Sequence, residues 1–146
     1  MKLFGHPLHL MLIHFPSALF PMDLICSCIS FYDESIILTQ SSLIMMLGGT
    51  LFGWIAVITG TFDLLTVMKN KPGAIKKALL HGGINTSILL AYTVLSFLAI
   101  RGNLNPGETG SVILVFKFLL VCIMLVGNYI GGSLVLKHKV LDRKTS

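Results

Sequence analysis

Residues 111–136 read SVILVFKFLLVCIMLVGNYIGGSLVL, an apolar run that a single charged residue, Lys117, interrupts. A helix of this length crosses the roughly 30 Å hydrocarbon core of a bilayer, because each residue adds about 1.5 Å. Three further stretches share this length and character: residues 9–32, 42–68 and 79–100. The sequence therefore predicts an all-α integral membrane four-helix bundle, formed by residues 1–146 as a single domain.

The composition excludes a soluble domain. Hydrophobic residues make up 54% of the chain and charged residues only 12%, whereas soluble domains carry about 25% charged residues. The net charge of +5 does not indicate nucleic-acid binding, because the basic residues do not gather into one patch. All three cysteines lie inside apolar stretches, which argues against a disulfide framework.

The basic residues predict the orientation of the bundle. Nine of the eleven Lys and Arg residues lie before the first span, between the second and third, or after the fourth. Asn103, Asn105, Pro106 and Gly107 make the third loop turn-rich, and Arg101 is its one basic residue. The positive-inside rule therefore places both termini in the cytoplasm, with the protein in the cytoplasmic membrane.

Small residues in two spans predict close helix packing. Gly49, Gly53, Ala56 and Gly60 lie on one face of the second span, and Gly127 and Gly131 repeat the spacing in the fourth. G-x-x-x-G spacings let helix backbones approach closely in lipid. The contact can lie within the bundle or form the seam of a homodimer.

Two prolines predict bends in the first span. Pro16 and Pro21 each remove a backbone donor and crowd the carbonyl four residues earlier, which belongs to Leu12 or Ser17. A carbonyl freed in this way inside a membrane needs another partner.

Polar side chains from all four spans fall in one layer. His14 and Asp63 lie roughly 7 Å inside the cytoplasmic boundary, and Asn85 and Asn128 lie roughly 9–12 Å inside. His81 lies near the boundary, on the same helical face as Asn85. Ionisable residues inside a membrane usually mark function. The alternative is that each histidine is merely hydrogen-bonded near the interface.

The layer has the chemistry of a haem or metal site. Imidazole binds iron through one nitrogen, and its other N–H is typically held by a carboxylate or carbonyl. We expect His14 and His81 to bind the cofactor and Asp63 and Asn85 to orient them. His6 and His9 precede the first span with an H-x-x-H spacing, which makes His9 a weaker candidate metal ligand.

Two charges lie in the opposite half of the membrane. Asp23 is roughly 13 Å and Lys117 roughly 9 Å from the outer boundary. They are placed to pair across the first and fourth helices, which would offset part of the cost of burial. Proton conduction through Asp23 is the alternative role.

The sequence resembles a family of small bacterial four-span membrane proteins. Gly5-His6-Pro7-Leu8-His9 followed by His14-Phe15-Pro16 is similar to the opening motif of the DUF2231 family, although Leu10 stands where that family often has a second proline. Gly60-Thr61-Phe62-Asp63 and His81-Gly82-Gly83-Ile84-Asn85 are similar to its later elements. Fusion of such relatives to Rieske or cytochrome c domains implies a respiratory setting.

These observations favour an electron carrier in the bacterial cytoplasmic membrane that binds a b-type haem. Gly60 and Gly82 would leave room for the macrocycle, and a quinone or cytochrome would be the redox partner. An accessory subunit of a larger membrane complex without a cofactor is a second hypothesis. A zinc, copper or iron site at His9, His14, Asp63 and His81 is a third. No nucleophile–base pair or phosphate loop indicates a stand-alone catalyst.

Overall fold

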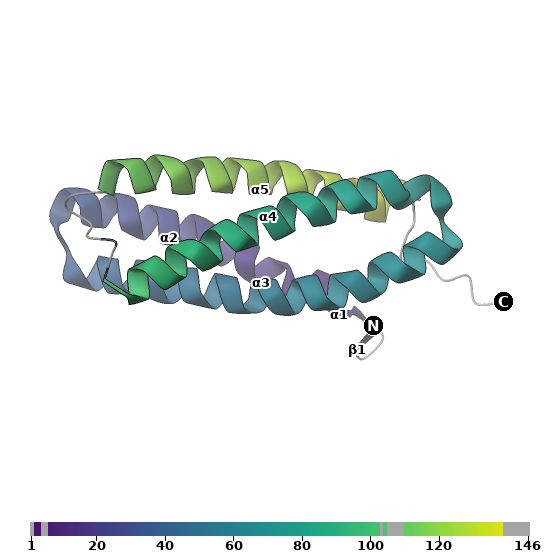
Figure 1. Cartoon of the computed structure of the whole chain (residues 1–146), viewed down its shortest axis with the longest axis horizontal. Coiled ribbons are helices and arrows are strands. Elements are labelled where there is room, and N and C mark those ends of the chain that lie inside the picture. Colours follow the sequence, from purple (N-terminus) through teal and green to yellow (C-terminus); the bar gives the residue numbers. More distant parts are fainter. Residues whose placement is uncertain (1, 4–5, 103, 105–109, 139–146) are drawn as a thin grey trace.

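Four long helices form an elongated bundle (Figure 1). The computed structural model describes residues 2–3, 6–102, 104 and 110–138. The elements, in chain order, are β1 (Lys2–Leu3), β2 (His6–Pro7), α1 (Leu8–Leu12), α2 (His14–Asp33), α3 (Ile36–Asn70), the 3₁₀ turn η1 (Pro72–Ala74), α4 (Ile75–Ile100) and α5 (Gly110–His138). β1 and β2 pair antiparallel, with Lys2 opposite Pro7 and Leu3 opposite His6.

The predicted four-span membrane fold is confirmed. The segments long and apolar enough to cross a bilayer are Leu8–Asp33, Ile36–Asn70, Pro72–Ile100 and Gly110–Leu136. The second begins earlier than residue 42 because Ser35 caps the helix, with its hydroxyl accepting from the backbone N–H of Leu38 at 3.5 Å. Two parts of the sequence analysis lie outside the described residues: the tail after residue 138, and the turn-rich residues Asn103, Asn105, Pro106 and Gly107.

Both ends of the described chain lie at one end of the bundle. In Figure 1 the β1 strand, the turn between α3 and α4 and the last residues of α5 share that end, which we call the terminal end. The α2–α3 connection lies at the opposite end, which we call the loop end. An even number of crossings requires this arrangement, whereas the cytoplasmic position of the terminal end stays a prediction.

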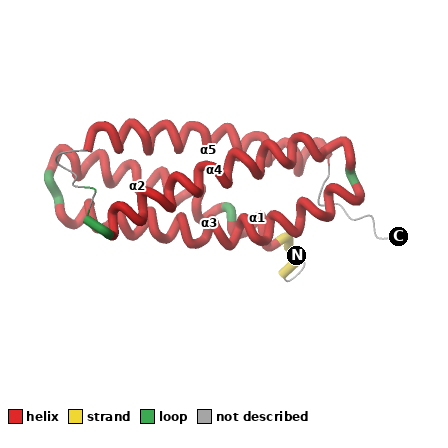
Figure 2. Tube along the Cα trace, in the orientation of Figure 1, coloured by secondary structure: helices red, strands yellow, loops and turns green. Residues whose placement is uncertain are grey.

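The first span is broken near its start. Figure 2 shows a short loop segment between α1 and α2, where Ile13 lies. Pro16 has no N–H to donate to the carbonyl of Leu12, which explains the break at this place. The Ser17 hydroxyl donates to the Ile13 carbonyl at 2.7 Å, and α1 packs against α3. α2 continues through Pro21 without interruption.

The glycine face of α3 contacts helices of the same chain. A Cβ at Gly49 would lie 2.6 Å from the ring of Phe20, and one at Gly53 would lie 2.6 Å from Leu89. The Phe20 ring stacks on Tyr92, with centroids 3.7 Å apart and planes 4° apart. The small residues therefore serve packing within the bundle at these positions. A homodimer stays a prediction without support from this face.

A buried ion pair joins α2 to α5, as the sequence predicts. The ammonium of Lys117 donates to Oδ1 of Asp23 at 2.7 Å, and the two residues are 4% and 0% exposed. Ser27 and Ser42 surround the pair, and the Ser42 hydroxyl donates to the same Asp23 oxygen at 2.5 Å. Oδ2 of Asp23 and the hydroxyl of Tyr92 are buried without a hydrogen-bond partner among the described residues.

Replacement of Gly49 tests the close approach of α2 and α3. We expect Gly49→Ala to lower the free energy of unfolding by about 1–3 kcal/mol, because the Phe20 ring is held by its stack and cannot yield. Gly48→Ala is the matched control, since its Cβ would meet only Leu19 at 3.4 Å. Thermal unfolding in detergent measures both variants. Equal stability of the two variants would contradict the packing described.

Removal of one partner tests the ion pair. We expect Lys117→Met to destabilise the fold by about 3 kcal/mol, because the Asp23 carboxylate would remain buried without its counter-charge. The double variant Asp23→Leu/Lys117→Met removes that uncompensated charge and should regain most of the loss. The midpoint of thermal unfolding checks this order. A double variant less stable than Lys117→Met would refute it.

Candidate functional site

A cavity of about 450 Å³ lies between the helices in the half of the bundle next to the terminal end. We call it the histidine cavity. Side chains from α1, α2, α3, α4 and α5 line it. They include all the polar residues that the sequence places in one layer and the weaker candidate His9: His9, His14, Asp63, His81, Asn85 and Asn128. The residues that the rise per residue predicts to lie at similar depths thus share one cavity.

His9 is held by α3. Its Nδ1 lies 2.8 Å from the carbonyl oxygen of Ala56. Because a carbonyl only accepts, Nδ1 must carry the proton, which leaves Nε2 with a free lone pair. The ring lies flush against Gly60, where a Cβ would come within 2.8 Å of Cε1. A glycine at this position is what allows the imidazole to reach the helix backbone.

His81 is held by α5 in the same way. Its Nδ1 lies 2.8 Å from the carbonyl oxygen of Gly127, and a Cβ at Gly131 would come within 2.5 Å of Cε1. The amide nitrogen of Asn85 lies 3.1 Å from the same Nδ1 and 2.9 Å from the His81 carbonyl. Nδ1 cannot donate to Gly127 and accept from Asn85 together, so the Asn85 amide donates to the carbonyl.

The two histidines form a matched pair. In each case the carbonyl that holds Nδ1 comes four residues before the glycine that lies under the ring. The ring centroids of His9 and His81 lie 6.5 Å apart, and the ring planes are inclined by 80°. Two imidazoles on different helices are therefore fixed in the same tautomer and face a common cavity.

The other predicted residues lie around this pair. Asp63 is half-buried in the cavity wall. Asn128 donates to the Ser17 hydroxyl at 3.0 Å, which closes the α2–α5 side. Asn85 lies beside His81, one helical turn further along α4. These positions suit a supporting role, although the carbonyls of Ala56 and Gly127 hold the rings.

His14 lies at the rim of the cavity and is exposed. In the sequence, His9 stands at the start of the first span and His14 lies about one and a half turns inside, which favours His14 as the ligand. The break at Ile13 makes α1 a separate element that packs on α3, which turns His9 inward. Gly60 is the residue in the sequence that could have indicated the position of His9, since a glycine allows a ring to approach the backbone of α3.

Open space adjoins Gly82 and Gly132. A Cβ at either would meet no atom within 4 Å, and both glycines line the cavity. Gly82 leaves room as the sequence analysis expects, whereas the ring of His9 covers Gly60. Among the described residues, no group of three or more His, Cys, Asp or Glu side chains is placed to hold a metal ion. The cavity therefore contains two oriented imidazole rings with open space beside them.

Comparison with known families agrees with the sequence motifs. The family described as a predicted membrane protein, DUF2231, matches residues 5–144. The chain belongs to the DUF2231 family. The match covers the histidine pair, the supporting residues and the ion pair of this DUF2231 protein. No curated protein and no solved structure matches it.

Replacement of Gly131 tests how His81 is held. We expect ¹⁵N NMR of histidine-labelled protein to show His81 with its proton on Nδ1. Gly131→Ala should abolish that signal, because the new Cβ would displace the ring from the Gly127 carbonyl. Gly132→Ala is the control, since its Cβ enters open space. An unchanged His81 signal in Gly131→Ala would contradict the arrangement.

Proposed function

We propose that this DUF2231 protein is a membrane electron carrier that binds a b-type haem between His9 and His81. The observation that carries the proposal is the paired orientation of these two imidazoles. Both are protonated on Nδ1 by virtue of a backbone carbonyl at 2.8 Å. Each therefore presents Nε2 as a ligand, with its ring orientation fixed in advance by the helix it contacts.

The separation of the rings suits a six-coordinate iron. Metal–nitrogen bonds of about 2 Å on opposite sides of one iron put imidazole centroids roughly 6 Å apart. The centroids of His9 and His81 lie 6.5 Å apart. His9 and His81, on separate helices with ring planes inclined by 80°, would be the residues that hold the haem.

The surroundings suit electron transfer better than catalysis. Bis-histidine coordination leaves no open iron position for a substrate, so iron would change oxidation state without bonding to another molecule. Asp63 places a carboxylate in the wall of the 450 Å³ cavity, where it would offset part of the charge of the iron. Gly82 and Gly132 border the open space into which the macrocycle would extend.

A metal ion bound by protein ligands alone has less support. The hypothesis needs His14 and Asp63 to join the histidine pair, but the described residues contain no group of three such ligands suitably placed. Haem supplies four nitrogen ligands of its own and requires only two from the chain. The pair His9–His81 is therefore better matched to haem than to a free ion.

The visible spectrum tests the proposal directly. We expect protein purified in detergent, with haem supplied during expression, to show a Soret band and the sharp reduced bands of a six-coordinate b-type haem. His9→Ala and His81→Ala should each abolish or shift these bands. His14→Ala is the discriminating control, because His14 lies at the rim and should leave the spectrum unchanged.

Three outcomes would change this assignment. A spectrum lost in His14→Ala but kept in His9→Ala would make His14 the ligand that pairs with His81. Metal without haem in the purified protein would favour an ion site. Protein with neither haem nor metal would reject the proposal and favour the accessory subunit of a membrane complex.

A further inference from the structure

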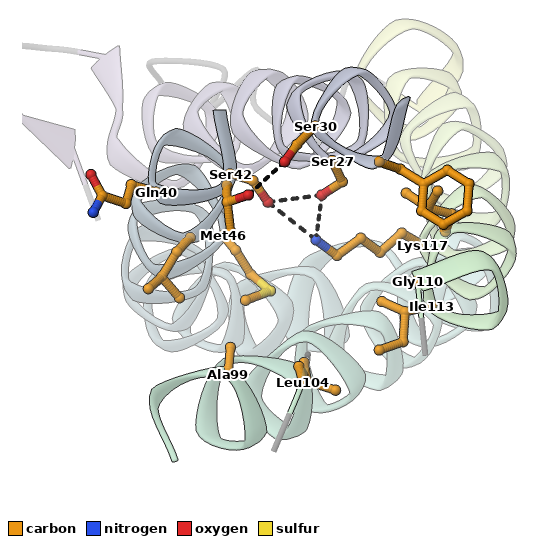
Figure 3. A pocket seen from close by; sticks show the side chains of 14 residues that line it. Ser27, Ser30, Gln40, Ser42, Met46, Ala99, Leu104, Gly110, Ile113 and Lys117 are labelled. Atoms are coloured by element: carbon orange, nitrogen blue, oxygen red, sulfur yellow. Dashed lines mark hydrogen bonds between the residues drawn. The ribbon is translucent and has the colours of Figure 1, made fainter. Parts of the chain in front are cut away.

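A second cavity, of about 190 Å³, lies in the half of the bundle next to the loop end. We call it the lysine cavity. It lies where the last turns of α2 and α4 meet the first turns of α3 and α5. Figure 3 shows Lys117 extending toward Ser27 and Ser42, with Ala99 and Leu104 on the side away from the serines. One wall is thus polar and the facing wall is apolar.

The Lys117 ammonium is the hydrogen-bond donor that the polar wall can offer to a ligand. The Lys117 ammonium donates to Asp23 at 2.7 Å and to Ser27 at 2.9 Å. Its third hydrogen bond, to Ser42 at 3.4 Å, is the longest of the three and therefore the weakest. The single proton of Ser42 is directed to Asp23. A ligand oxygen in the cavity would therefore find an ammonium proton that the protein holds only weakly.

The charge of the wall selects a neutral ligand. Lys117 and Asp23 form one ion pair with no net charge, so the wall does not attract an anionic headgroup strongly. The remaining lining is largely apolar and includes Leu43, Ile113 and Leu114. At the rim, Phe31 is 38% exposed on the outside of the bundle, where a transmembrane helix meets lipid. The ligand should be neutral and membrane-soluble and carry a hydrogen-bond acceptor.

We propose that the lysine cavity binds the ring of a membrane quinone, with a quinone carbonyl accepting a hydrogen bond from Lys117. A quinone has a neutral ring with carbonyl acceptors, and its hydrocarbon tail remains in the bilayer. The preference for a quinone over other neutral acceptors rests on the proposed electron-transfer function. The cavity and its donor do not depend on haem.

Photoaffinity labelling of haem-free protein tests this site. An azidobenzoquinone with a short alkyl tail is photolysed with the protein in detergent, and mass spectrometry maps the labelled peptides. We expect saturable labelling of the first turns of α3 and α5, with competition by decylbenzoquinone. An excess of phosphatidylglycerol or of dodecane should not compete.

A cavity-filling variant gives the matched comparison. Ala99→Phe places a ring in the cavity and leaves the ion pair intact, so labelling should be lost. Val94→Phe adds the same ring to the same helix at a position that is 58% exposed, and labelling should persist. Thermal unfolding checks that both fold, and Ile113→Phe replaces Ala99→Phe if that variant does not.

The outcomes separate this inference from the proposed function. Labelling that does not saturate, or that survives filling of the cavity, would overturn the quinone site. Labelling displaced equally by phosphatidylglycerol would assign the cavity to lipid. Saturable quinone labelling, together with no Soret band in protein expressed with haem supplied, would reject the haem and keep this site. A Soret band without labelling would do the reverse.

Discussion

The arrangement of the helices depends on the buried ion pair between Asp23 and Lys117. A charge in hydrocarbon is costly without a counter-charge, so these residues, 94 positions apart in sequence, hold α2 and α5 in one register. The bond between Asn128 and Ser17, at 3.0 Å, repeats the connection nearer the terminal end. From the ion pair to this bond, the residue number falls from 23 to 17 in α2 and rises from 117 to 128 in α5. The two helices are therefore antiparallel. The position of α5, and with it the backbone that holds His81, follows from this register.

Close contact between imidazole rings and helix backbones then fixes the orientation of His9 and His81. Gly60 and Gly131 let imidazole rings lie on the backbones of α3 and α5, where carbonyls one turn earlier take the Nδ1 protons. Each ring has a backbone carbonyl, and not a side chain, as the acceptor that sets its tautomer. The orientation of the pair is therefore built into the helix geometry and needs no bound group to establish it.

The features that could be predicted from the sequence are those that depend on one helix at a time. Span lengths follow from hydropathy, and the polar layer follows from the rise per residue, because both depend on one helix at a time. The Asp23–Lys117 pair follows because a buried charge requires an opposite one. The inward position of His9 does not follow, since it depends on how α1 packs on α3 before the break at Ile13. The unpartnered Asp23 oxygen and Tyr92 hydroxyl depend on three-dimensional packing that no spacing encodes.

The distribution of polar groups bears on what can cross the bundle. The histidine cavity and the lysine cavity occupy opposite halves, and between them lies an apolar core that includes Phe20, Leu89 and Met124. An ion or proton needs polar groups or water along its whole path, and the polar side chains buried at this level include the hydroxyls of Thr50, Ser96 and Tyr92. An electron does not need a continuous polar path, because it moves between cofactors rather than through side chains that bind it. Under the proposed function, an apolar layer between two polar sites is compatible with an electron carrier.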